Sequence, residues 1–453
     1  MDDPHAKDIE GQVSNEPKLS VEPSEGSSGI EAFDDPDLFP EGGWVAYRVV
    51  IGCFVGFIGT LGFVNATGVI QTYVTTNILK DSPESDVGWI FSVYNFMAFG
   101  STLVSGPVFD RVGARIPLLI GIVLQTVGFM CLSVSTEVYQ FVLGYGILAG
   151  LGTSFTFAPF LGAISHFFLK KRAQAIGAAY MGGALGGIIF PLVFRSLFPK
   201  VGFGWGIRIG AFMVFGFLLI GFALIADRKE EIHAGHNYQS GGVIKQIVQS
   251  IDLTVFKDKI YTCLVLALLG NGFAFLISLT YIPSYAVANG VPQNSSYLLL
   301  VVFNAMSIPG RVIPGYYADK YGRFNMLCLI ALLSTMAFCI IWIPPPIGHT
   351  LTGLYVFSGC YGFTSGSILS LAPACIGQIC HTRDFGKRYG TAYFALSFGD
   401  LIGIPIGGAI IGSGNSVKGF DHLVIFITVL SAMGTIAAFS ARYFYAGVKM
   451  IKV

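Results

Sequence analysis

Twelve long apolar segments constrain the fold of this chain more than any other feature. Each has about the 20 residues that a helix needs to cross a bilayer. Only 12% of the 453 residues are charged, against roughly 25% in a soluble domain. Because a backbone in lipid must satisfy its own hydrogen bonds, we predict an all-α membrane protein with 12 transmembrane helices. The predicted spans are 44–72, 87–109, 116–135, 138–166, 174–197, 206–226, 260–286, 295–317, 325–343, 350–379, 389–412 and 422–446.

A short polar motif, G-x-x-x-D-(R/K)-x-G, occurs once in each half of the chain, between two apolar segments. The first glycine allows close helix contact, and the second allows the chain to reverse. Its aspartate can pair with a nearby base or meet the positive N-terminus of a neighbouring helix. Topology alone also places Gly, Asp and Arg in such loops, but the duplication favours a gating role. The gating candidates are Gly106, Asp110, Arg111, Gly113, Arg115, Gly315, Asp319, Lys320 and Gly322.

The repeat extends beyond these turns. Ala158-Pro159 and Ala372-Pro373 lie near the ends of the fourth and tenth spans, and Pro191 and Pro405 follow each pair at the same distance. Parallel repeats of six helices are the organisation of the major facilitator superfamily. We therefore predict two six-helix pseudo-repeats. The predicted parts are an acidic disordered tail (1–43), an N-terminal bundle (44–226), a linker with a short amphipathic helix (227–259), a C-terminal bundle (260–446) and a second tail (447–453).

Basic residues collect in alternate loops, such as 111–115, 170–172, 320–323 and 383–388. The positive-inside rule then predicts that these loops and both termini are cytosolic. We expect a multi-pass protein of the plasma membrane, with a vacuolar or other endomembrane location as the alternative.

A second stretch carries a family resemblance. Phe167-Phe168-Leu-Lys170-Lys171-Arg172 and the glycine-rich segment that follows it resemble the fifth-helix signature of the monocarboxylate transporter family. Glu41-Gly42-Gly43-Trp44 resembles the entry to that family's first helix. The chain is most similar to a fungal branch that includes riboflavin transporters, on residues such as 89–94, 310–315 and 385–389.

Two ionisable residues lie deep inside predicted spans, where charge is costly and usually functional. Arg311 falls where the resembled family has an arginine associated with the substrate anion, and its guanidinium stays charged. The alternative is a structural ion pair or a helix contact. Asp400 could pair with Arg311 or carry the proton of a symporter. Asn65 and Ser307 stand where that family has a lysine and an acid, which argues against a lactate-type mechanism.

Polar and aromatic stripes on the first, fourth and seventh spans are candidates for lining a central site. Amide, hydroxyl and aromatic groups together suit a neutral, flat, hydrogen-bonding solute. Such stripes can equally face lipid or a neighbouring helix. With Arg311, the substrate-binding candidates are Asn65, Thr72, Thr156, Asn271, Ser278 and Tyr285.

These features predict a transporter rather than an enzyme. The chain has no G-x-x-x-x-G-K-(S/T) motif for ATP, and its histidines and cysteines show no metal-ligand spacing. We expect no cofactor, no metal and no nucleic-acid partner, and a functional monomer in the bilayer. The leading function is alternating-access transport of riboflavin or a related small solute. The alternatives are a monocarboxylate or organic-anion proton symporter and a non-transporting nutrient sensor, although the short tails favour transport.

Overall fold

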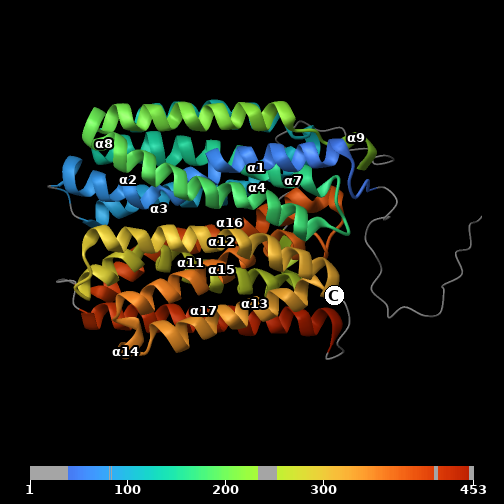
Figure 1. Cartoon of the computed structure of the whole chain (residues 1–453). Helices are drawn as coiled ribbons and strands as arrows, with labels where there is room; N and C mark the ends of the chain where they lie inside the picture. Colours follow the sequence, from blue (N-terminus) through green and yellow to red (C-terminus); the bar gives the residue numbers. More distant parts are fainter. Residues whose placement is uncertain (1–38, 81, 83, 233–252, 413–416, 448–453) are drawn as a thin grey trace, which may run out of the picture. The chain divides into compact units, whose positions relative to one another are not determined.

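The computed structural model describes residues 39–447 except 81, 83, 233–252 and 413–416, and it is helical throughout that part of the chain (Figure 1). Helices are the form in which an apolar segment satisfies its own backbone hydrogen bonds. The predicted amphipathic helix of the linker and the tail 1–38 lie outside the described residues.

The first half contains the helices that correspond to spans one to six. Three spans, two in the first half and one in the second, continue as short π-helical stretches. The elements are α1 (Trp44–Asn65), α2 (Thr67–Tyr73), η2 (Val74–Ile78), α3 (Glu84–Gly100), α4 (Thr102–Val112), α5 (Arg115–Leu132), α6 (Val138–Gln140), η3 (Phe141–Ala149), α7 (Gly150–Ser165) and α8 (Arg172–Leu224).

The second half repeats this arrangement after the short helix α9 (Lys229–Ile232). Its elements are η4 (Leu253–Lys257), α11 (Lys259–Ala288), α12 (Gln293–Tyr321), α13 (Arg323–Ala337), η5 (Phe338–Trp342), α14 (Pro345–Gly348), α15 (Leu351–Ile376), η6 (Thr382–Asp384), α16 (Phe385–Ile411) and α17 (Val417–Ala446).

The predicted spans all have helical counterparts. Ten helices in the described chain are long and apolar enough to cross a membrane. One of them, α8, covers two predicted spans, and its backbone breaks at Gly202, where φ is 75°. The tenth predicted span corresponds to α15, a continuous helix of 26 residues. It is not among the ten because its Gly, Ser and Thr residues lower its mean hydropathy. The all-α fold with two six-helix halves is confirmed.

Helix pairs across the two halves follow the same symmetry as the sequence repeat. The second span contacts the eleventh, through α4 and α16, and the eighth contacts the fifth, through α12 and α8. Inside the halves, α1 packs along α8 and α11 packs along α17. The repeated polar motif ends α4 and α12, so each copy lies where one half meets the other.

Candidate functional site

The Asp110 carboxylate binds the beginning of a helix from the other half. Asp110 lies in the last turn of α4 and is 6% exposed. Its two oxygens accept hydrogen bonds from the backbone N–H groups of Gly386 at 3.0 Å and Lys387 at 2.8 Å. These groups begin α16, and the first N–H groups of a helix have no partner inside it. The negative charge also complements the helix dipole.

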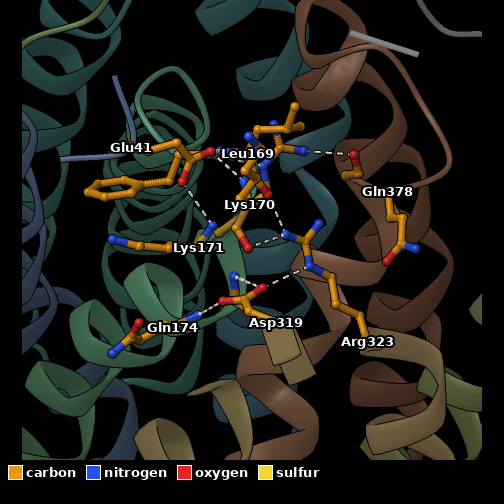
Figure 2. Close-up of polar contacts among 12 residues, drawn as sticks. Glu41, Leu169, Lys170, Lys171, Gln174, Asp319, Arg323 and Gln378 are labelled. Atoms are coloured by element: carbon orange, nitrogen blue, oxygen red, sulfur yellow. Dashed lines mark hydrogen bonds and ion pairs between the residues drawn. The ribbon is translucent and has the colours of Figure 1, made fainter. Parts of the chain in front are cut away.

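Asp319 makes the equivalent contact in the second copy of the motif. Its oxygens accept hydrogen bonds from Ala173 at 3.2 Å and Gln174 at 2.8 Å, the first residues of α8 (Figure 2). Arg323, one turn further along the chain, donates its Nε to Asp319 at 3.1 Å. Each half thus reaches the other through one carboxylate, which is buried for Asp110 and partly buried for Asp319. We call these two contacts the Asp110 latch and the Asp319 latch.

The motif glycines explain why the helices can come so close. A Cβ on Gly106 would lie 2.2 Å from the Gly386 carbonyl oxygen, and one on Gly315 would lie 2.9 Å from that of Ala173. The second glycine of each motif, Gly113 or Gly322, has a positive φ of 82° or 106°. Both are values that residues with a side chain rarely adopt. The predicted close contact and chain reversal are therefore present in both copies.

The basic residues of the motif do not contact its carboxylates. Arg115 and Lys320 are exposed, and Arg111 is partly buried. The Lys320 ammonium lies 5.4 Å from the ring of Tyr321. The sequence predicted either a nearby base or a helix N-terminus as the partner of each aspartate. Both aspartates bind a helix N-terminus, and Asp319 also binds a base, Arg323.

Two arginines that the sequence pattern did not single out join the halves beside the latches. Arg172 is fully buried and donates to the Gly377 carbonyl at 2.7 Å and to the Thr382 hydroxyl at 2.6 Å. Arg323 donates to the carbonyl of Leu169 (Figure 2). The position of Arg323 was a usable signal, because it begins α13 directly after the turn at Gly322, and this turn brings it back towards Asp319 near the end of α12. We call the end of the bundle that carries both arginines and both latches the basic face.

Arg311 lies between the halves, on the face of α12 that packs against α8. It is 4% exposed, and its Nη1 donates to the carbonyl of Tyr180. The guanidinium also lies 5.8 Å from the centre of the Tyr180 ring. Gly177 makes this approach possible, since a Cβ there would lie 2.0 Å from the Arg311 carbonyl oxygen. The Nε of Arg311 is buried with no partner in the described chain.

Aromatic rings from both halves surround the Tyr180 side of this contact. The ring centres of Tyr389 and Tyr393 lie 4.2 Å apart, and the hydroxyls of Tyr180 and Tyr389 are buried with no hydrogen-bond partner in the described chain. The ring of Phe157 lies 6.0 Å from those of Tyr389 and Tyr393 and 6.1 Å from that of Tyr180. We call Phe157, Tyr180, Tyr389 and Tyr393 the central aromatic cluster. Its members come from α7, α8 and α16, so it too joins the halves.

Asn65 is brought close to Arg311. Its Nδ2 donates to the Gly183 carbonyl at 3.0 Å. The Nη1 of Arg311 approaches the same residue, because a Cβ on Gly183 would lie 3.3 Å from it. The two predicted substrate-binding residues therefore flank one turn of α8.

The other predicted binding residues contact helices of their own half. Thr156 pairs with the Thr60 hydroxyl at 3.1 Å. Asn271 donates to the Ala267 carbonyl at 2.9 Å and lies against Gly434 of α17. These two side chains thus face neighbouring helices of their own half, which is the alternative that the sequence left open.

Ser278 and Tyr285 continue the stripe of Asn271. The Ser278 hydroxyl is buried with no hydrogen-bond partner in the described chain, and Tyr285 donates to an Asp421 oxygen at 3.4 Å. The side chain of Thr72 lies outside the described residues. The described contacts of Ser278 and Tyr285 therefore do not include Arg311.

Asp400 forms no ion pair with Arg311. In the described chain the aspartate has neither an ion pair nor a hydrogen bond, and it is partly buried. Tyr393 of the central aromatic cluster lies two turns earlier on the same helix, α16. The predicted pairing is thus not a feature of this conformation, in which Arg311 contacts Tyr180 instead.

The fold and these contacts describe two helical halves that meet through carboxylates bound to helix ends. Residues 52–360 match the model of the Major Facilitator Superfamily, and the chain belongs to this superfamily. Its relatives are fungal transporters, not enzymes.

Among these relatives is the riboflavin transporter MCH5 of Saccharomyces cerevisiae, which is 36% identical over 432 residues, 92% of this chain and 82% of that protein. The aspyridones efflux protein apdF of Emericella nidulans is 34% identical over 411 residues, 90% of this chain and 80% of its own. Among solved structures, the proton:xylose symporter XylE has a TM-score of 0.68 at 14% identity, with 89% of this chain and 96% of that chain covered. This last likeness concerns the fold.

Proposed function

We propose that this transporter carries riboflavin or a related flat, hydrogen-bonding solute by alternating access. The observation that carries the proposal is the meeting of Arg311, Asn65 and the central aromatic cluster between the halves. Aromatic rings offer faces for a flat solute, and the amide and guanidinium offer donors for its polar edge. The 36% identity to a protein named as a riboflavin transporter supports the same substrate class.

In this proposal the latches set the state of the transporter. With both carboxylates on their helix ends, the basic face is closed. Opening it requires the Asp110 and Asp319 contacts to break, together with the Arg172 and Arg323 contacts beside them. The solute would then leave or enter between Tyr180 of one half and Tyr389 and Tyr393 of the other.

The positive-inside rule supports a cytosolic basic face with both termini on the same side. We propose the plasma membrane as the location, with the vacuolar or another internal membrane as the alternative. A monomer is sufficient in this mechanism, because both halves of the site belong to one chain.

Riboflavin uptake tests the proposed substrate. In cells that cannot synthesise riboflavin, expression of this chain is expected to raise the initial uptake of labelled riboflavin at least about tenfold over empty-vector cells, as expected for a carrier that lowers the barrier by about 1.4 kcal/mol or more. Unlabelled lactate, added in excess, should not compete. Riboflavin uptake equal to that of the vector would remove riboflavin as the substrate, whereas competition by lactate would favour the monocarboxylate alternative.

The direction of transport has a second candidate. The relative from Emericella nidulans is named as an efflux protein, which favours export of a small organic compound. Uptake into intact cells and into inverted membrane vesicles, measured with the same labelled solute, separates import from export.

Asp400 is the proposed site of proton coupling. The carboxylates of Asp110 and Asp319 are occupied by backbone N–H groups. Asp400, in the middle of α16, has no hydrogen bond or ion pair in the described chain, which makes it the candidate to take up a proton. Substitution Asp400→Asn is expected to remove any stimulation of uptake by external acid while leaving some transport at neutral pH. The initial uptake rate at external pH 5 and pH 7, compared with wild type, is the measurement. An unchanged pH dependence would make Asp400 structural.

A further inference from the structure

The segment that leads into α1 is bound to the loop that immediately precedes α8, the helix whose N-terminus Asp319 binds. Glu41 places its carboxylate against three consecutive backbone N–H groups (Figure 2). These belong to Leu169 at 2.7 Å, to Lys170, and to Lys171 at 3.0 Å. The backbone N–H of Glu41 also donates to the Phe167 carbonyl at 3.1 Å. Glu41 thus binds the loop that precedes α8 from one side.

The opposite side of this loop binds the other half of the protein. The carbonyls of Leu169 and Lys170 accept hydrogen bonds from Arg323. Arg323 in turn binds Asp319, which caps the N-terminus of α8 immediately after the loop. The contacts therefore run without a gap from Glu41, through the loop, to Arg323 and Asp319.

The backbone at Glu41 indicates that its position is strongly determined. Glu41 has a φ of 51°, the one non-glycine residue with positive φ in the described chain. Such a conformation is costly for a side chain larger than glycine and persists where surrounding contacts fix it. Here the three N–H groups supply those contacts. Without the carboxylate, they would lose a charged acceptor.

The other latch has a counterpart of different origin. The Asp227 carboxylate, at the end of the first half, accepts hydrogen bonds from Ala114 at 2.8 Å and from Lys229 at 3.3 Å. Ala114 belongs to the loop after Asp110. Each latch thus adjoins a loop that a further carboxylate binds. Glu41 binds the loop before α8, the helix that Asp319 caps, and Asp227 binds the loop after α4, the helix that carries Asp110.

We infer that Glu41 is a positioning residue for the Asp319 latch. By holding residues 169–171, it keeps their carbonyls in place for Arg323 and the start of α8 in place for Asp319. Release of Glu41 from this loop loosens the Asp319 latch and favours opening of the basic face. The inference rests on the proposed gating role of Asp319.

The experiment measures exposure of a single cysteine at each latch, in the full-length transporter freed of its native cysteines. Ala173 is fully buried and bonded to Asp319, so Ala173→Cys reports on that latch. Thr102 begins α4, is fully buried, and its hydroxyl contacts the Gly390 carbonyl of α16 at 3.4 Å, so Thr102→Cys reports on separation of the two helices that the other latch joins. A membrane-permeable maleimide labels each cysteine when its latch opens.

Glu41→Gln is expected to raise the labelling rate of Cys at position 173 about tenfold, the change that loss of one charge-assisted hydrogen bond produces. The rate at position 102 should change little. The matched variant Asp227→Asn should show the reverse pattern, and Glu41→Asp should restore part of the protection. A general loss of folding would raise both rates together and would overturn the inference.

The variant Asp319→Asn distinguishes a failure of the positioning role of Glu41 from a failure of the gating role of Asp319. If Asp319→Asn exposes position 173 and Glu41→Gln does not, Glu41 has no positioning role while the latch stands. If Asp319→Asn also leaves position 173 protected, the latch itself is wrong.

Discussion

Asp110→Asn and Asp319→Asn are each expected to lower the maximal transport rate at least about tenfold, with a much smaller change in the substrate dissociation constant. Each carboxylate accepts two backbone hydrogen bonds at the N-terminus of a helix from the other half. Losing the charge removes about 1.5–3 kcal/mol from the closed state, because charge-assisted bonds to a helix end are among the stronger ones. A transporter that cannot close one side cannot complete its cycle.

The measurement for these variants is the concentration dependence of initial uptake, together with substrate binding to the purified protein. Glu137→Gln is the control, because this carboxylate is exposed and belongs to the capping box of the short helix α6 within the first half. A main effect on the dissociation constant, with the maximal rate preserved, would place the two aspartates in the binding site rather than in the gate.

Gly177→Ala is expected to reduce transport by about tenfold or more, since overpacking of a close contact costs about 1–3 kcal/mol. The added Cβ would lie 2.0 Å from the Arg311 carbonyl oxygen, so α8 and α12 would have to separate at the point where the halves meet. Gly106→Ala should act in the same way, with its Cβ 2.2 Å from the Gly386 carbonyl oxygen.

The control is Gly216→Ala on the same long helix, where a Cβ has no heavy atom within 4 Å. Uptake is normalised to the amount of protein at the membrane, which separates transport from expression. Transport by Gly177→Ala at the level of Gly216→Ala would show that close approach at Arg311 is not needed for the cycle.

The sequence alone predicted the features that depend on local pattern. Long apolar segments determine the helices because lipid leaves the backbone no other partner. The duplicated motif predicted two equivalent turns, and Gly113 and Gly322 have the positive φ expected there. The contact of each aspartate with a helix N-terminus was one of two possibilities named, and it occurs in both copies.

Features that depend on which helices become neighbours could not be predicted. The spacing of Asn271, Ser278 and Tyr285 establishes that they share a helix face, but not that this face meets α15 and α17. The Glu41 contact joins residues that lie far apart in the sequence. Tyr389 and Tyr393 join the central aromatic cluster because α16 crosses to α7 and α8, which no helical period reveals.

The width of the basic face tests the central claim, that the two aspartates hold it closed. Spin labels at Arg115 and Arg383, in a protein freed of native cysteines, report the distance between the halves at this face. Arg115 is exposed and Arg383 is partly exposed, and neither contacts a latch carboxylate directly. We predict a short distance in the wild type and a shift of the population to a longer one in the Asp110→Asn, Asp319→Asn double variant. The same short distance in both proteins would contradict the account.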